Sequence, residues 1–275
     1  MDQQSLENSL NDLPLSGVRY YESIHSTNDV AAELAIHGVG DNFLVVANEQ
    51  VKGKGRQGRT WFTYPNSALA FSLLILPTKD EIIKNNLILT RFTGVGALAV
   101  CRVLSQIYSL AAVIKWPNDI LINQRKVCGV LVEAQWNGDN LSKIIIGIGI
   151  NITPQSLPSD GKISNPATCI ESEVGYPIER ITLLKQILNE IMYWRSQMFS
   201  DEFVRSWESN LAYLGHTVNI VIKRRSTERF EENITGHLVG LNTDGAIKLE
   251  NSDGDQSVIK EEIISLTGIE YDQSG

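Results

Sequence analysis

The amino-acid sequence predicts an α+β protein that ends in a small β-barrel. Its 275 residues are enough for one large domain and one small one, and a composition with 43% hydrophobic and 20% charged residues excludes intrinsic disorder over most of the chain. Apolar runs typical of strands alternate with the periodicity of helices over most of the sequence. From about Leu214 onward, short strands and turns follow one another, which is typical of a small barrel.

Strand and helix signals are well separated in the first part of the chain. Residues 18–24, 43–47 and the near-continuous apolar run 68–76 predict strands. Between the first two, Ser26-Thr27-Asn28-Asp29 has the spacing of a helix N-cap with an acidic residue in the first turn. Apolar residues at every third or fourth position predict a helix over residues 85–108.

The remaining elements follow the same signals. A meander of strands is expected at residues 113–116, 120–122, 127–134 and 144–150. Helices are expected at residues 181–198 and about 202–208, and the final strands at 218–221, 234–241, 246–249 and 258–264. Residues 1–16 are polar and non-periodic, which predicts a flexible N-terminal tail.

The composition argues against several classes of protein. The net charge is −8, whereas a nucleic-acid-binding surface is usually basic. No apolar stretch approaches the ~18 residues of a membrane span, and the N-terminal segment lacks the basic and apolar regions of a secretory signal. Cys101, Cys128 and Cys169 form no CxxC pair, so we expect free thiols in a reducing cytoplasm.

The most distinctive segment is the basic glycine loop, residues 53–59, with the sequence Gly-Lys-Gly-Arg-Gln-Gly-Arg. It matches GxGxxG, but the sequence Thr-Trp-Phe-Thr-Tyr-Pro that follows cannot open the helix that a dinucleotide site needs. Lys52, Lys54, Arg56 and Arg59 repel one another unless an anion lies among them. The alternative is a solvated basic turn.

Three further motifs carry chemically useful side chains. Lys115-Trp116-Pro117-Asn118-Asp119 places a cation beside an amide and a carboxylate that suit a metal or a ribose; the alternative is an Asx turn at a strand end. In the motif at residues 126–133, Lys126 heads a buried strand and either faces a ligand or is solvated. The glycines of Gly147-Ile148-Gly149-Ile150-Asn151 indicate either a close approach to the backbone or a bulge.

Taken in order, these motifs resemble those of the biotin–protein ligases. The resemblance runs from about Tyr20 to Leu266 and includes Ser26-Thr27-Asn28, the segment 49–61 with the glycine loop, and the three motifs above. It implies a mixed β-sheet flanked by helices, as in class II synthetases, followed by an SH3-like barrel. The implied division is a tail at residues 1–16, a catalytic domain at 17–212 and an SH3-like domain at 213–275.

The resemblance also implies a reaction and a set of site residues. Biotin and ATP would form biotinyl-5′-AMP, and the biotinyl group would pass to a lysine of a carboxylase carrier domain. Lys126 and Arg56 would be catalytic. Biotin contacts are implied for Ser26, Thr27, Asn28, Gln50, Lys54, Gly55, Arg56, Lys126 and Gly129. ATP or adenylate contacts are implied for Gly53, Lys54, Arg56, Arg59, Trp61, Lys115, Asn118, Asp119 and Asn151. Mg²⁺ is the implied cofactor, with no ligand assigned.

Two departures from the family pattern matter. Lys54 stands where the family usually has Arg, so the charge is kept while the two-pronged guanidinium contact is lost. Val51-Lys52 stands where Thr-Ala is common. Regulatory members carry a winged helix-turn-helix ahead of the ligase domain, whereas only a short polar tail precedes residue 18 here. We therefore expect the ligase-only type.

The expected partner is the biotin carboxyl carrier protein of acetyl-CoA carboxylase or of a related carboxylase. No nucleic acid and no membrane are expected, and the chain would act as a monomer or homodimer. Two alternatives stay open: a lipoate–protein ligase with the same fold and chemistry, and a non-catalytic regulator that binds biotin or its adenylate. The basic glycine loop favours the biotin family over the first, and the presence of Lys126 and Arg56 argues against the second.

Overall fold

The computed structural model describes residues 1–275 except 84, 158–165, 224–230, 260–261 and 270–275. The larger part is an eight-stranded sheet in the order β1-β2-β4-β8-β7-β6-β5, with β3 paired to β2 beside this path. β1 and β2 run parallel and the other neighbours antiparallel, so the predicted mixed sheet is confirmed. The strands are β1 (Gly17–Ile24), β2 (Phe43–Lys54), β3 (Thr60–Thr63), β4 (Ala68–Ile75), β5 (Ala112–Lys115), β6 (Asp119–Ile122), β7 (Arg125–Asn137) and β8 (Asn140–Asn151).

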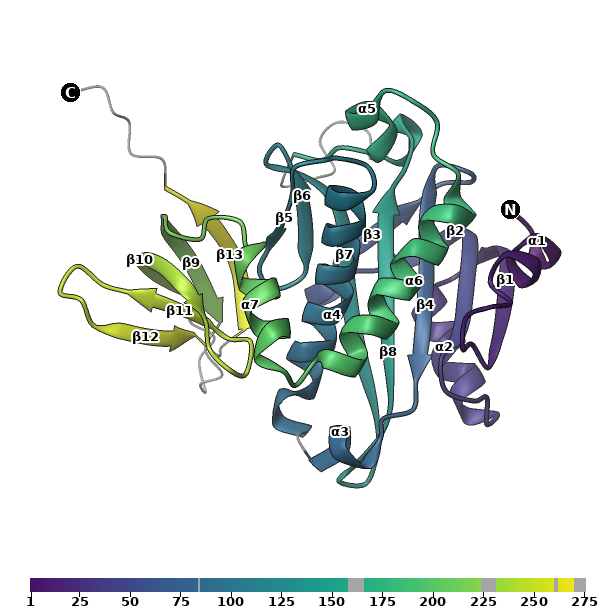
Figure 1. Ribbon diagram of the computed structural model, residues 1–275, viewed down its shortest axis with the longest axis horizontal. Coiled ribbons are helices and arrows are strands. Elements are labelled where there is room, and N and C mark those ends of the chain that lie inside the picture. The colour runs from purple at the N-terminus through teal and green to yellow at the C-terminus, as the bar shows by residue number, and fades with distance from the viewer. Residues whose placement is uncertain (84, 158–165, 224–230, 260–261, 270–275) are drawn as a thin grey trace.

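Helices cover both faces of this sheet (Figure 1). α4 (Asn85–Gln106) and α6 (Arg180–Gln197) lie side by side on one face, where α4 packs on β7 and β8. α2 (Thr27–Ile36) packs on β2, β4 and β8 from the other face. β4 lies between these layers, so all eight of its residues are buried, which explains its near-continuous apolar sequence.

α4 is a core element of the fold. Contrary to the sequence prediction, its residues 88–106 are long and apolar enough to span a membrane, with a mean hydropathy of 1.4. However, 72% of this window is buried within the protein. The packing of α4 against the sheet and α6 therefore accounts for its apolar sequence.

The N-terminal segment differs from the prediction of a flexible tail, which is wrong for residues 1–13. α1 (Gln3–Ser9) begins at an Asp2 N-cap that accepts from the Ser5 amide at 2.8 Å. Leu6, Leu10 and Leu13, spaced four and three residues apart, are buried in the main core. The Gln3 side chain donates to the Val18 carbonyl and accepts from the Tyr20 amide, so this segment also covers the edge of β1.

Several shorter elements differ from the sequence pattern. β2 continues past residue 47 to Lys54 and so includes the start of the basic glycine loop, and β3 follows that loop. α3 (Lys79–Ile83) and α5 (Ile170–Val174) are not predicted, because five-residue helices carry little periodicity. The single strand expected over residues 258–264 is wrong: the structure has β12 (Gln256–Ile259) and β13 (Glu262–Gly268) there.

The C-terminal part is a second, antiparallel sheet that fits the predicted SH3-like domain. It follows α7 (Asp201–Ser209) and has the strand order β12-β11-β10-β9-β13. The strands not yet given are β9 (Thr217–Lys223), β10 (Glu231–Leu241) and β11 (Ile247–Glu250). The predicted boundary between residues 212 and 213 falls between α7 and β9.

The β10–β11 turn attaches this small sheet to the large one. Trp116 Nε1 donates to the Gly245 carbonyl at 2.8 Å, and the buried Arg91 of α4 donates to the Thr243 carbonyl. Gly245 has a φ of +81°, and a Cβ added there would lie 2.5 Å from the Trp207 ring of α7. The turn therefore fits against α7 and α4 only without a side chain at position 245.

Gly245→Ala is expected to lower the free energy of unfolding by about 2–4 kcal/mol, because left-handed backbone strain and overpacking against Trp207 add together. Gly254→Ala is the matched control: its φ is +84°, but a Cβ there meets nothing within 4 Å. The control should lose only about 1–2 kcal/mol. Urea denaturation measures both, and equal losses would show that the turn does not press on Trp207.

Candidate functional site

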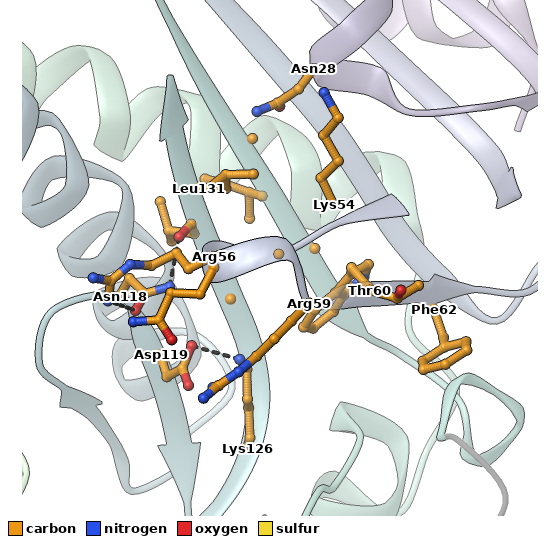
Figure 2. A pocket seen from close by; sticks show the side chains of 18 of the residues that line it. Asn28, Lys54, Arg56, Arg59, Thr60, Phe62, Asn118, Asp119, Lys126 and Leu131 are labelled. Atoms are coloured by element: carbon orange, nitrogen blue, oxygen red, sulfur yellow. Dashed lines mark hydrogen bonds and ion pairs between the residues drawn. The ribbon is translucent and has the colours of Figure 1, made fainter. Parts of the chain in front are cut away.

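A cavity of about 860 Å³ opens on the large sheet beside the basic glycine loop (Figure 2). Its volume is in the range of small-molecule sites. It is lined by the N-terminal turn of α2, the end of β2, the glycine loop, β6 to β8, and Ser265 and Leu266 of the C-terminal sheet. The predicted site residues that line it are Ser26, Thr27, Asn28, Gln50, Lys54, Gly55, Arg56, Arg59, Trp61, Lys115, Asn118, Asp119, Lys126, Gly129 and Asn151.

Gly53 does not belong to this lining. It pairs with Trp61 across β2 and β3, and a Cβ there would lie 2.3 Å from the Trp61 carbonyl oxygen. Its observed role is to let the two backbones approach each other, whereas we expected an adenylate contact. The other glycine of the loop start, Gly55, is in the lining.

At one end of the cavity, Gln50 completes the first turn of α2. Ser26 is the N-cap residue, as predicted, but its side chain makes no capping bond. Instead, Gln50 Oε1 accepts from the Thr27 amide at 2.8 Å and lies 3.1 Å from Thr27 Oγ1. Gln50 Nε2 donates to Thr63 Oγ1 at 3.1 Å. A free helix N–H group is thereby satisfied, and a cluster of buried polar groups is held in place.

The floor of the cavity is a pair of glycines covered by an indole. Gly129 of β7 and Gly149 of β8 are cross-strand partners. A Cβ on Gly149 would lie 2.4 Å from Trp61 Nε1, and one on Gly129 would lie 3.2 Å from the same ring. The close approach that the glycines indicated is therefore made by Trp61. Its buried Nε1 has no hydrogen-bond partner among the described residues.

Cations gather at the other end. Lys126 Nζ lies 2.6 Å from Asp119 Oδ1 and 5.5 Å from the centre of the Trp61 ring. Burial lowers the pKa of Lys115, the neighbouring charges of Lys126 and Arg59 lower it further, and Asp119 opposes them. Three cations, Lys115, Lys126 and Arg59, thus lie close enough to interact, with Asp119 as the opposing carboxylate, and this arrangement favours a bound anion.

The two leading cations of the glycine loop point in different directions (Figure 2). Arg56 donates to Asn118 Oδ1 at 3.1 Å, and Asn118 is itself fixed by a bond from its Nδ2 to the Val130 carbonyl at 2.9 Å. Lys54 points toward α2 and forms an ion pair with Asp29, which raises the pKa of Lys54. Arg56 therefore lies with the cation cluster and Lys54 does not. The sequence had predicted that both residues contact the adenylate.

Asn151 has a structural contact as well as a place in the lining. Its side chain is buried, and Nδ2 donates to the Thr168 carbonyl at 3.0 Å. This bond holds the segment that includes Ala167, which also lines the cavity. Sequence reasoning did not identify Ser156, Ala167, Ser265 or Leu266, because their neighbours form no recognisable motif.

The residues that line the cavity suit a metal ion that is coordinated mainly by a bound substrate and by water. No group of three or more His, Cys, Asp or Glu side chains within the described part of the chain could hold a metal ion. Asp119 is the one carboxylate among the described residues that line the cavity. Mg²⁺ usually takes one or two carboxylates together with water and substrate phosphates.

Known proteins are similar to this chain in sequence and in fold. Residues 20–151 match the model of the biotin/lipoate A/B protein ligase family. The chain is 28% identical over 245 residues to the bifunctional ligase/repressor BirA of Bacillus subtilis, covering 89% of this chain and 72% of that protein. It is 29% identical over 246 residues to the biotin–[acetyl-CoA-carboxylase] ligase of Paracoccus denitrificans, covering 86% and 96%.

Solved structures agree. The biotin protein ligase of Aquifex aeolicus in complex with biotin and ATP superposes with a TM-score of 0.75 and 29% identity, covering 92% of this chain and 99% of that one. A mixed sheet flanked by helices and a small C-terminal sheet are the architecture that this chain shares with these biotin protein ligases. Residues 20–151 form a domain that matches the biotin/lipoate A/B protein ligase family.

Gly149→Ala is expected to lower the free energy of unfolding by about 1–3 kcal/mol, because the new methyl group overlaps the Trp61 indole. In a Trp61→Ala background the same substitution should be neutral or stabilise by about 0.5–1 kcal/mol, as a strand glycine is replaced without a clash. A double-mutant cycle in urea measures the coupling. Equal effects of Gly149→Ala in both backgrounds would contradict the observed contact.

Proposed function

We propose that this protein is an ATP-dependent biotin–protein ligase. In the first step, a biotin carboxylate oxygen attacks the α-phosphorus of ATP and pyrophosphate leaves, giving biotinyl-5′-AMP. In the second step, a carrier lysine amine attacks the acyl carbon, AMP leaves, and the nitrogen loses a proton as the amide forms. The observation that carries this proposal is one cavity with buried polar groups at one end and a cluster of cations at the other.

The charges of the site suit the first step. A carboxylate and a phosphate repel each other, so their contact costs electrostatic energy. Lys126, Lys115 and Arg59 lie at one end of the cavity with a single carboxylate, Asp119, against them. Fixed cations of this kind stabilise the negative charge that builds on the phosphorus oxygens. In this proposal Lys126 and Arg56 hold the reacting carboxylate and phosphate, while Ser26, Thr27 and Gln50 hydrogen-bond the ureido ring.

We include Mg²⁺ as the cofactor that accompanies ATP. When bound, it would neutralise negative charge on the phosphates. Asp119 is the described cavity residue suited to contact it, directly or through water.

The alternatives differ in the ring they would bind and in whether they react. A lipoyl dithiolane has no N–H groups, and the buried Thr27 and Asn28 and the half-buried Gln50 would be left partly unpaired around it. A non-catalytic regulator would not need cations placed where the phosphorus oxygens react. The cation cluster therefore supports the enzyme.

For partners, we propose the carrier domain of acetyl-CoA carboxylase or of a related carboxylase. This rests on the relatives, one of which is named for that substrate. We also propose that the protein binds no nucleic acid, which its net charge of −8 supports, and that it acts in the cytoplasm as a monomer or homodimer.

The direct test is transfer of labelled biotin to a purified carrier domain, with and without ATP, and with lipoate as the competitor. ATP-dependent labelling of the carrier, resistant to excess lipoate, is the expected result. Labelling with lipoate in preference to biotin would identify the alternative enzyme. Tight biotin binding without adenylate formation would identify the regulator.

Lys126→Ala should lower kcat/KM for adenylate formation by about ten- to hundred-fold, since a charged hydrogen bond contributes about 1.5–3 kcal/mol. Pyrophosphate release measures this step. The control is Lys185→Ala, which removes an ion pair to Asp12, 2.8 Å long, and lies outside the cavity lining. The control should retain wild-type activity, and a Lys126→Ala enzyme with equal activity would remove Lys126 from the reaction.

The basic glycine loop should become more ordered when the adenylate forms, because its cations can then bind the phosphate of the adenylate together. Limited trypsin digestion is expected to cut the free enzyme at Lys52, Lys54, Arg56 or Arg59. Biotin with MgATP should slow these cuts strongly. Mass spectrometry that finds the same cleavage rate in both states would overturn this prediction.

A further inference from the structure

A buried serine interrupts the most apolar strand of the sheet. Ser72 is the one hydroxyl in β4, whose sequence is ALAFSLLI, and it is fully buried. Its Oγ lies 2.7 Å from Thr27 Oγ1 and 2.6 Å from Asn28 Oδ1. Because a hydroxyl has a single hydrogen, Ser72 can donate to only one of these two oxygens and must accept from the other.

Glu133 of β7 determines to which of the two oxygens Ser72 donates. Its Oε2 lies 2.6 Å from Asn28 Nδ2. A carboxylate only accepts hydrogen bonds, so it turns the amide NH₂ of Asn28 toward itself and the amide oxygen toward Ser72. Ser72 therefore donates to Asn28 and accepts from the Thr27 hydroxyl.

The position of Asn28 is itself enforced. A Cβ on Gly147 would lie 2.1 Å from Asn28 Oδ1, so the glycine of β8 opens the place in which the amide fits. The chain Glu133, Asn28, Ser72, Thr27 thus has a fixed direction from a carboxylate to a side chain that lines the cavity.

This direction has a chemical consequence at the cavity. If the Thr27 hydrogen goes to Ser72, then Thr27 Oγ1 keeps lone pairs that can accept. Gln50 Oε1 then receives only the Thr27 amide, at 2.8 Å, and also has a free lone pair. Two acceptors side by side suit the N–H groups of a cyclic urea and do not suit a dithiolane ring.

We propose that Ser72 and Glu133 are positioning residues that set the hydrogen-bond direction of Thr27 and thereby select a ligand whose ring donates N–H groups. This inference rests on the proposed function, since the urea is that of biotin. Neither residue is in the lining of the 860 Å³ cavity, although Glu133 lines a neighbouring cavity beside the glycine loop; both act through Asn28 and Thr27.

The first test is Ser72→Ala. Without the hydroxyl of Ser72, Thr27 turns its hydrogen to Gln50 Oε1 and occupies the lone pair of Gln50 that would otherwise accept from the ligand. The KM for biotin should rise about ten-fold, while kcat at saturating biotin and the KM for ATP stay within about two-fold. The selectivity for biotin over lipoate, measured as a ratio of Kd values, should fall by a similar factor.

The matched control is Ser67→Ala. Ser67 is also buried, directly precedes β4, and donates to the Tyr64 carbonyl at 2.8 Å. It should lose similar stability in thermal melts and keep the wild-type KM for biotin. Equal KM values for the two variants would overturn the inference.

A second pair of variants tests the inference even if the Ser72→Ala protein does not fold. Glu133→Gln keeps an oxygen that can accept from Asn28, so its KM for biotin should stay within about three-fold of the wild type. Glu133→Leu removes the acceptor and should raise KM about ten-fold. Glu133 also acts electrostatically on Lys54, and a loss of charge alone would give both variants the same KM, which would overturn the inference.

The two proposals fail separately. A wild-type protein that forms no biotinyl-adenylate would refute the proposed function. A wild-type protein that forms it, with Glu133→Leu and Glu133→Gln both at the wild-type KM for biotin, would refute only the role of Ser72 and Glu133.

Discussion

The cavity depends on one constraint: a patch of the large sheet must carry no side chains. Gly129, Gly147 and Gly149 leave the backbone of β7 and β8 bare, so Trp61 can lie over one part of the patch and Asn28 over another. Each strand glycine costs about 0.5–1 kcal/mol relative to alanine. Packing and function together offset that cost, because the floor and the polar end of the cavity both require the space that the missing side chains leave.

The large elements could be predicted because burial on one or both faces leaves a clear pattern. The stripe of α4 and the unbroken apolar run of β4 are examples, each explained by the layers around it. α1 was missed although Leu6, Leu10 and Leu13 have helical spacing, because three apolar residues in a polar segment give a weak signal. The network of Ser72 was missed for a different reason: a hydroxyl in an apolar run is informative only when its partners are known.

The sequence could predict which residues gather at the site, but not how their side chains are oriented. The motifs supplied half of the residues that line the cavity, yet they could not show that Lys54 turns away from Arg56 toward α2. The substitution of Lys for the usual Arg gives a physical reason. A compact ammonium group is satisfied by one carboxylate, here Asp29, whereas a guanidinium favours a two-pronged partner. The positive charge of the loop is therefore divided between the two ends of the cavity.

The two sheets build the cation end of the cavity together, although the sequence suggests separate domains. Trp116 is flanked by Lys115 and Pro117, and its indole is held by the Gly245 carbonyl of the small sheet, 129 residues away in the chain. Leu266 of the same sheet lines the cavity directly. No hydrophobic periodicity encodes such a contact, because it depends on where a tight turn comes to rest in the folded protein. The small sheet thus positions the segment from which Lys115, Asn118 and Asp119 project, and it helps to shape the site where we propose that ATP reacts.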